Sequence, residues 1–271
     1  MDDGTTLWRA RGTGLLATDD PPPTSINNPR GSAPFLLTGD HAGDAIPAAL
    51  GTLGLAGRDR ARHIALDIGV RGLGLALAER LDACFVHQRY SRLVIDCNRD
   101  PARADAVPAE SDGTAVPGNA GAATAPRAAA IHAPYHAAIA AAIARRRAAG
   151  RPTVLVALHS FTPVMAGEAR PWHVGVLHDR GDARFALALL AALAAGSDLA
   201  IGDNQPYRMD ATDFSVPHHA YPAALPYAEI EVRQDLIADA AGQARWADRL
   251  AAALVAAWRA YGAGDALPSH G

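Results

Sequence analysis

The stretch FLLTGDHAGDAIP, residues 35–47, decides how the rest of this chain is interpreted. Its apolar run stops at Asp40 and leads into a glycine-containing turn that carries His41 and Asp44. An apolar strand that ends in polar residues is typical of an α/β sheet, whose ligands bind at the carboxyl ends of the strands. A His-x-x-Asp pair is also the usual first half of a three-ligand zinc site. Alone, the same pattern would describe a polar turn after a buried strand.

Composition narrows the class of protein. The chain has 271 residues, of which 49% are hydrophobic, so it can bury a large core. The formal net charge of -3 gives no broad attraction to nucleic acid or to an anionic membrane, and we expect a small-molecule partner. Cys84 and Cys97 are expected to be buried thiols, and no secretory signal or apolar span precedes them. These features predict a cytoplasmic protein.

Periodicity predicts one α/β domain over residues 32–262, with an irregular lead-in at 1–31 and a tail at 263–271. Strands are expected to alternate with helices in a three-layer α/β/α sandwich around a mostly parallel or mixed sheet. The predicted strands are 35–40, 84–86, 89–98, 153–159, 173–178, 200–207 and 227–235, and the predicted helices are 63–81, 128–150, 182–196 and 241–261. The strands at 84–86 and 89–98 are close enough in sequence to form a hairpin or to be neighbouring edge strands. Residues 100–126 and the polar stretch through His218 and His219 are expected to be loops.

Polar residues with catalytic chemistry recur where the predicted strands end. They are His41, Asp96 with Asn98 and Arg99, His159, and Glu231. Buried charge is costly unless it is paired or bound to a metal, so a scaffold alone would not need this set of side chains. The sequence therefore predicts a catalytic site at one edge of the sheet.

Five segments in order resemble the N-formylglutamate amidohydrolase family: DHAGDAIP, HIALDIG, RYSRLVIDCNRDP, LHSFTP and EIEVRQDL. The resemblance runs from about Phe35 to about Trp258, and RYSRLVIDCNRDP is its most specific part. It implies a zinc-dependent hydrolase that cleaves the N-acyl amide of an acidic amino acid, with N-formylglutamate giving formate and glutamate.

A more distant similarity links the chain to zinc carboxypeptidases and aspartoacylase-like deacylases. Those families carry, in order, a His-x-x-Glu pair, an Asn-Arg pair, a later histidine and a glutamate near the C-terminus. This sequence differs in having Asp44 where they have glutamate, and the aspartate is one methylene shorter. The similarity implies metal ligands His41, Asp44 and His159, and Asp67 of HIALDIG is the alternative third ligand.

Each remaining residue then has an implied role. Glu231 would act as the general acid and base, with Glu229 as its competitor two residues away. Arg92 would stabilise the developing oxyanion. Asn98 and Arg99 would bind a substrate carboxylate, since the planar guanidinium meets two oxygens together. One Zn²⁺ per chain is expected, although another divalent metal suits the same ligands.

Three alternatives stay open at this stage. The enzyme could be a related zinc deacylase on another N-acyl amino acid, or a carboxypeptidase-like enzyme on a small peptide. A binding protein could keep the fold and the carboxylate-binding residues without turnover. An apolar stripe on the last predicted helix would also be compatible with a homodimer.

Overall fold

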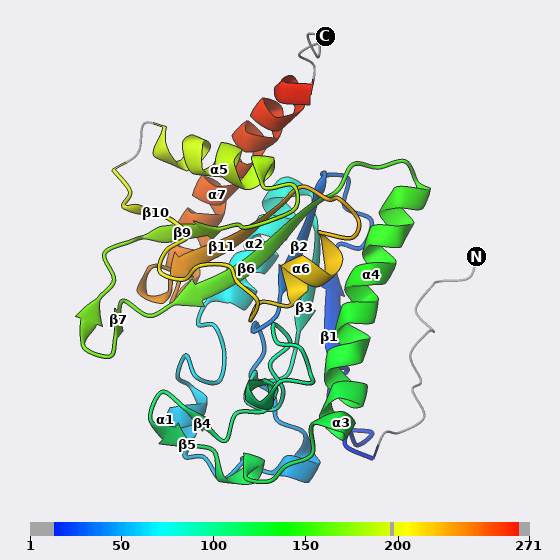
Figure 1. Ribbon diagram of the computed structural model, residues 1–271, viewed down its shortest axis with the longest axis vertical. Coiled ribbons are helices and arrows are strands. Elements are labelled where there is room, and N and C mark those ends of the chain that lie inside the picture. Colours follow the sequence, from blue (N-terminus) through cyan, green and yellow to red (C-terminus); the bar gives the residue numbers. More distant parts are fainter. Residues whose placement is uncertain (1–13, 196–197, 266–271) are drawn as a thin grey trace.

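The computed structural model describes residues 14–195 and 198–265. A seven-stranded mixed sheet forms its centre (Figure 1), and the strand order is β1-β3-β2-β6-β11-β9-β10. The four inner strands β3, β2, β6 and β11 are parallel, and β1 and β9 pair antiparallel with β3 and β11 at either side. The strands are β1 Thr24–Asn27, β2 Phe35–Gly39, β3 Cys84–Gln88, β6 Val154–Phe161, β9 Val174–Leu177, β10 Ile201–Asp203 and β11 Tyr227–Arg233. The predicted α/β fold with a mixed sheet is confirmed.

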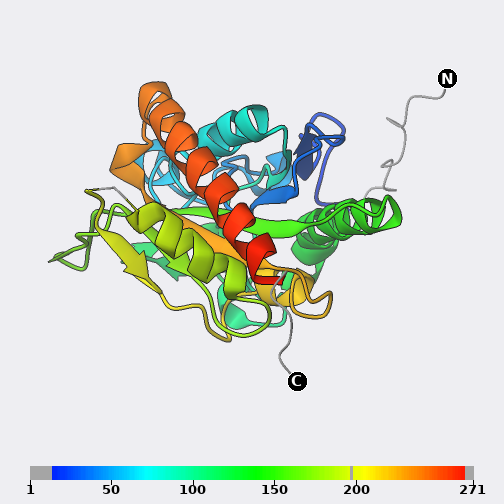
Figure 2. The same cartoon turned by 90° about the horizontal axis from the view of Figure 1, so that it is seen from above.

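Helices cover both faces of this sheet and give three layers. On one face α2, α5 and α7 pack together, as the view from above shows (Figure 2). On the other face lie α4 and the short α6. The helices are α1 Gly57–Arg60, α2 Val70–Leu81, α3 Thr124–Arg127, α4 Ala133–Ala148, α5 Arg184–Ala194, α6 Ser215–His219 and α7 Ala240–Asp265.

Alternation along the inner strands separates two hydrophobic cores. In β2, Phe35 and Leu37 contribute to the core under α2, α5 and α7, whereas Leu36 contributes to the core on the α4 side. Successive side chains of a strand point to opposite faces, so one apolar run can serve both layers. The side chains of β6 alternate in the same way, and Leu155 and Ala157 lie on the α4 side. By the same alternation, His159 belongs to that side of the sheet.

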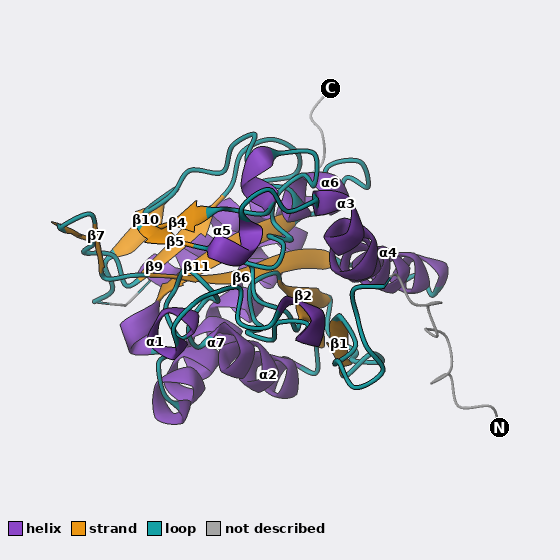
Figure 3. Ribbon diagram, turned by 90° about the horizontal axis from the view of Figure 1, so that it is seen from below, coloured by secondary structure: helices purple, strands orange, loops and turns teal. Residues whose placement is uncertain are grey.

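Loops gather at the end of the sheet where the inner parallel strands finish. They carry α1 and two short hairpins, β4 Glu110–Ser111 with β5 Thr114–Ala115, and β7 Val164–Met165 with β8 Glu168–Ala169. The view from below shows mainly loops over this end (Figure 3). Residues 100–126, predicted as a loop, therefore include a small hairpin and α3.

The helix predicted over residues 63–81 begins later, at Val70. Gly69 precedes it with a φ of 84°, a left-handed conformation that favours glycine and ends any helical run from the N-terminal side. A Cβ at this position would also lie 2.1 Å from the carbonyl oxygen of Ile237. Asp67 consequently lies in the loop before α2, so its predicted position on a helix is wrong.

The strand predicted over residues 89–98 is absent from the sheet. The backbone there turns repeatedly: Ser91 N donates to Ala45 O, Arg92 N to Ala65 O, and Val94 N back to Ser91 O. The apolar run was correctly interpreted as buried, because Leu93, Val94 and Ile95 pack in the α4-side core. A short apolar run alone cannot distinguish a buried strand from another buried segment, and here it misled. The predicted hairpin is wrong with it, since β3 pairs with β2 and β1.

Three further boundaries differ from the expectation. Part of the predicted irregular lead-in at 1–31 forms β1, which pairs with β3 through backbone groups and needs no apolar pattern. His218 and His219 end α6 instead of lying in a loop. α7 extends to Asp265, and residues 266–271 of the predicted tail lie outside the described residues. Within the described part of the chain, no helix is long and apolar enough to cross a membrane.

Candidate active site

Side chains from four parts of the chain converge at the carboxyl ends of β2, β6 and β11. His41 follows β2, His159 lies on β6, Glu231 lies on β11, and Asp67 comes from the loop before α2. Glu231 is directly opposite His159 in the parallel pairing of β11 with β6. These four side chains line a cavity of about 490 Å³. The predicted meeting of polar residues at one sheet edge therefore occurs.

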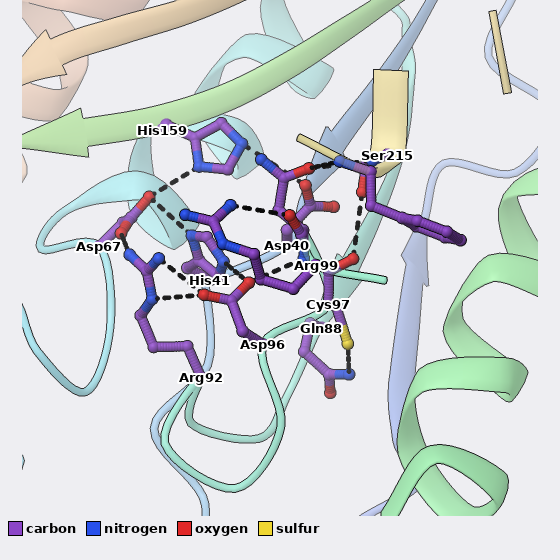
Figure 4. A network of polar contacts seen from close by, with 12 residues as sticks. Asp40, His41, Asp67, Gln88, Arg92, Asp96, Cys97, Arg99, His159 and Ser215 are labelled. Atoms are coloured by element: carbon purple, nitrogen blue, oxygen red, sulfur yellow. Dashed lines mark hydrogen bonds and ion pairs between the residues drawn. The ribbon is translucent and has the colours of Figure 1, made fainter. Parts of the chain in front are cut away.

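Three buried residues place potential metal ligands together (Figure 4). One ligand atom each from His41, Asp67 and His159 lies within 4.8 Å of the other two. Asp67 Oδ2 is 3.4 Å from His41 Nδ1 and 2.9 Å from His159 Nδ1. Asp44, in contrast, is exposed and does not belong to this group. The geometry therefore favours Asp67, the alternative third ligand, over Asp44.

A second carboxylate contacts the far side of each imidazole. His41 Nε2 lies 2.7 Å from Asp96 Oδ1, and His159 Nε2 lies 3.5 Å from Asp40 Oδ2. The Tyr135 hydroxyl donates to Asp40 at 2.6 Å and fixes that carboxylate. A carboxylate only accepts, so it favours the proton on the nitrogen facing it and leaves Nδ1 free to bind a cation. This is the carboxylate–histidine arrangement that orients imidazoles at metal sites.

The charges of the neighbouring carboxylates and imidazoles shift one another's pKa values. Burial would lower the pKa of His159, but Asp40 and Asp67 raise it well above its usual value. Burial and Arg92 would likewise lower the pKa of His41, yet the neighbouring carboxylates raise it. Burial alone would raise the pKa of Asp67, and the two histidines hold it below its usual value. Each ring in this group is thus adapted to a positive charge between carboxylates.

The donor set fits a divalent metal. Two imidazoles and one carboxylate are the ligands that catalytic zinc sites use, with a further position left for water or substrate. The Nδ1 atoms of both rings face Asp67 Oδ2, so the three potential ligands point toward one place. His41, Asp67 and His159 would therefore hold the ion, and Asp40 and Asp96 would orient the imidazoles.

Two glutamates of β11 enter the same cavity. Glu229 and Glu231 are 2% and 6% exposed, and the Oε2 atom of each is buried without a hydrogen-bond partner among the described residues. Burial raises the pKa of Glu231 to about 7, with Asp67 adding to the rise and His159 opposing it. The pKa of Glu229 is raised well above its usual value, again chiefly by burial. Glu231 is therefore the better placed of the two to exchange protons near neutral pH.

Arg92 lines the cavity and is held by two carboxylates. Its Nε and one terminal nitrogen donate to Asp96 Oδ2 at 3.1 and 2.7 Å, and the other terminal nitrogen donates to Asp67 at 3.3 Å. Burial would lower the pKa of Arg92, but Asp96 and Asp67 raise it. The guanidinium is consequently a fixed positive charge at the edge of the metal-ligand group.

Asn98 and Arg99 also reach the cavity, but their side chains differ in freedom. The Asn98 amide oxygen accepts from the backbone N–H groups of Phe214 and Ser215, and its Nδ2 donates to Asp213. Asn98 thus fastens the loop before α6 to the site. Arg99 donates to two backbone carbonyls, lies 3.5 Å from Asp105 and lines the cavity.

Several functional neighbours were given no role by the sequence. Asp40 lies one position from His41, and Asp96, which the sequence placed among the strand-end residues without a role, lies two positions from Asn98. A search for a second carboxylate near each proposed ligand could have flagged them. Tyr135 is 95 positions from Asp40, and no local signal connects the two. The loop before α6 supplies Tyr207 and Arg208 to the cavity wall, which only the tertiary structure shows.

Comparison with known proteins defines the class and then the family. A family model described as N-formylglutamate amidohydrolase matches residues 33–238, which is more than half of the chain. The protein is accordingly a hydrolase of C–N amide bonds other than peptide bonds. It belongs to the N-formylglutamate amidohydrolase family, and the resemblance seen in the sequence is confirmed.

Two solved structures support the fold. A gene product of Agrobacterium tumefaciens is 36% identical with a TM-score of 0.88, covering 92% of this chain and 99% of its own. An N-formylglutamate amidohydrolase from Ralstonia eutropha JMP134 is 19% identical with a TM-score of 0.64, covering 89% of this chain and 99% of its own. At that identity the second match shows the fold alone. No curated protein matches the chain.

Proposed function

We propose that this protein is a zinc-dependent enzyme that hydrolyses the N-formyl amide of an acidic amino acid, converting N-formylglutamate and water to glutamate and formate. One observation carries the proposal: Glu231, whose Oε2 atom has no hydrogen-bond partner among the described residues, lies opposite His159, beside a buried His-Asp-His group that fits a metal. Membership of the family supports the substrate class. A mere scaffold would not require a buried carboxyl left without a partner.

The metal would be held by His41, Asp67 and His159. When bound, it supplies Lewis-acid chemistry that polarises an amide carbonyl and makes water more acidic. Glu231 accepts the proton of the attacking water and returns it to the nitrogen of the leaving amine, a role suited to a carboxyl with a pKa of about 7. Water and the amide thereby become formate and the free amine.

Two arginines stabilise the negative charges of the substrate. Arg92, fixed by Asp67 and Asp96, offers its remaining N–H groups to the carbonyl oxygen as negative charge develops there. Arg99 binds a carboxylate of the amino acid, and Asn98 holds the loop that shapes this part of the cavity. A cytoplasmic location and a homodimer stay predictions from the sequence.

The test combines metal analysis with turnover. Protein purified without chelators should contain about one zinc per chain and release formate from N-formylglutamate, and a chelator should stop the release. Glu231→Gln should lower kcat by roughly 10²- to 10⁴-fold with unchanged metal content. The matched control is Glu79→Gln on the exposed surface of α2, which should leave both unchanged.

Other outcomes would redirect the proposal. Zinc-loaded protein that releases acetate from N-acetylglutamate but no formate would point to another deacylase. Cleavage of small peptides instead would favour the carboxypeptidase-like alternative. A protein that binds zinc and N-formylglutamate without turnover would leave the binding protein as the better interpretation.

A further inference from the structure

Glu229 is a buried cavity residue that the proposed mechanism does not use. It lies on β11 two residues before Glu231, so both side chains share one face of the sheet, about 7 Å apart along the strand. Its neighbours across the sheet are Ala157 of β6 and Leu177 of β9, and Leu177 also lines the cavity. Glu229 therefore forms the inner wall next to the reacting centre.

The carboxyl of Glu229 lacks the partners that the neighbouring structural acids have. Its Oε2 atom is buried and has no hydrogen-bond partner among the residues that the structure describes. Asp96 accepts from Arg92 and from the backbone N–H of Asn98, and Asp213 accepts from Asn98 and from the backbone N–H of Asp210. A buried acceptor that faces a cavity without a partner is costly to keep for stability alone. Its position indicates a contact with a ligand.

The cavity that Glu229 lines holds groups that suit each polar part of an N-acyl amino acid. Arg99, whose guanidinium can bind a carboxylate, lines the same cavity, and Asn98 beside it donates to Asp213 in the cavity lining. Next to Glu229 comes Glu231, opposite His159. An N-acyl amino acid presents its amide N–H between its carboxylate and its carbonyl, so a substrate bound by Arg99 and by the metal-ligand group needs an acceptor between them.

We propose that Glu229 accepts a hydrogen bond from the N–H of the scissile amide and so positions the substrate between Arg99 and the metal-ligand group. The proposal rests on the proposed function and deepens it. Accepting this bond needs one carboxyl oxygen, which both the neutral and the ionised group provide. Burial that raises the pKa of Glu229 agrees with this role, because it leaves proton exchange to Glu231.

The test uses two substrates that differ only in the proposed donor. N-formylglutamate has the amide N–H, and the formate ester of 2-hydroxyglutarate has an oxygen in its place. Glu229→Met keeps the volume but removes the acceptor, so it should lower kcat/KM for the amide about 10-fold more than for the ester. Glu229→Gln keeps an acceptor oxygen and should restore most of the amide-to-ester ratio.

The matched control is Leu177→Met, which alters the same wall without removing an acceptor, and it should change both substrates alike. If Glu229→Met does not fold, Glu229→Asp withdraws the carboxyl by one methylene and should shift the ratio in the same direction. Equal losses on both substrates would overturn the assignment of Glu229 alone. Wild-type protein that releases no formate from N-formylglutamate would overturn the proposed function and this inference together.

Discussion

Two groups of buried histidines in this protein are built for opposite purposes. His41 and His159 lie between carboxylates, and their pKa values are raised. His136 of α4 and His219 of α6 lie on the other side of Asp40 and Tyr135, joined by a 3.0 Å contact between His136 Nδ1 and His219 Nε2. Burial and neighbouring histidines lower their pKa values to about 3 and about 4.

The contrast shows that burial alone does not make a histidine a ligand. His136 Nε2 contacts the carbonyl oxygen of Cys97 at 2.9 Å, and no carboxylate contacts His136 or His219 in the part of the chain that the structure describes. These rings stay neutral and join α4, α6 and the turn at Cys97. The carboxylates Asp40, Asp67 and Asp96 are what prepare the other two rings for a cation.

The largest expected effect is on metal binding and concerns the third ligand. Asp67→Asn should weaken zinc binding by more than about 100-fold and abolish turnover, because it removes the carboxylate between the two imidazoles. Asp44→Asn, on the exposed turn, should bind zinc like the wild type. Competition with a chromophoric chelator measures both affinities. Loss of zinc from the Asp44 variant only would restore the first sequence prediction.

A smaller effect should follow from the carboxylate behind His41. Asp96→Asn removes a partner of that imidazole and should weaken zinc binding by roughly 10- to 100-fold, without abolishing it. His136→Gln, in the neutral group, should leave the affinity unchanged. Equal weakening in the two variants would mean that both histidine groups support the metal, and the contrast would fail.

A third effect, on the free energy of unfolding and not on metal binding, is the pH dependence of stability. The pKa of His136 is about 3 in the folded state against about 6.5 when unfolded, so between these values the unfolded state binds more protons. Stability from this group is full above pH 6.5 and is lost as the pH falls. His136→Gln should therefore flatten the fall between pH 6.5 and 4 by up to about 1.4 kcal/mol per pH unit, as measured by urea unfolding.

In metal-free protein, the site histidines His41 and His159 should make the stability depend on pH with the opposite sign. Their folded pKa values are raised, so their contribution is full below the unfolded value and is lost as the pH rises through the folded one. His41→Gln should then alter the change of the free energy of unfolding with pH above pH 6.5. Below pH 6.5 this change should stay as in the wild type, because it depends there on His136. A steeper acid slope in the His136 variant would contradict the assignment of a neutral ring.

The sequence predicted those parts of the site that lie at the ends of apolar runs. His41, His159 and Glu231 follow or end such runs, and parallel strands bring their carboxyl ends together. The third ligand was harder to predict, because His-x-x-Asp spacing points to Asp44. Asp67 reaches the site through a loop whose backbone N–H donates to the carbonyl oxygen of His41. That hydrogen bond has no signature in local periodicity.

The neutral histidine group shows where prediction from the sequence stops. His219 was expected in a loop, and no pattern in the sequence joins it to His136. Their contact joins residues 83 positions apart on two helices, and α6 was not predicted. The strand predicted over residues 89–98 was wrong for a related reason. These residues are buried in the α4-side core through a series of turns and not through strand pairing.

The family match and the folding unit do not share boundaries. The match covers residues 33–238, whereas β1 ends at Asn27 and α7 begins at Ala240. α7 packs on α2 and α5 and buries Leu250 and Leu254, and β1 shields the edge of β3. An expression fragment limited to residues 33–238 would lack both elements. The apolar surfaces of α2 and α5 and the backbone edge of β3 would then be exposed, and such surfaces favour self-association. Cloning limits should therefore enclose both elements.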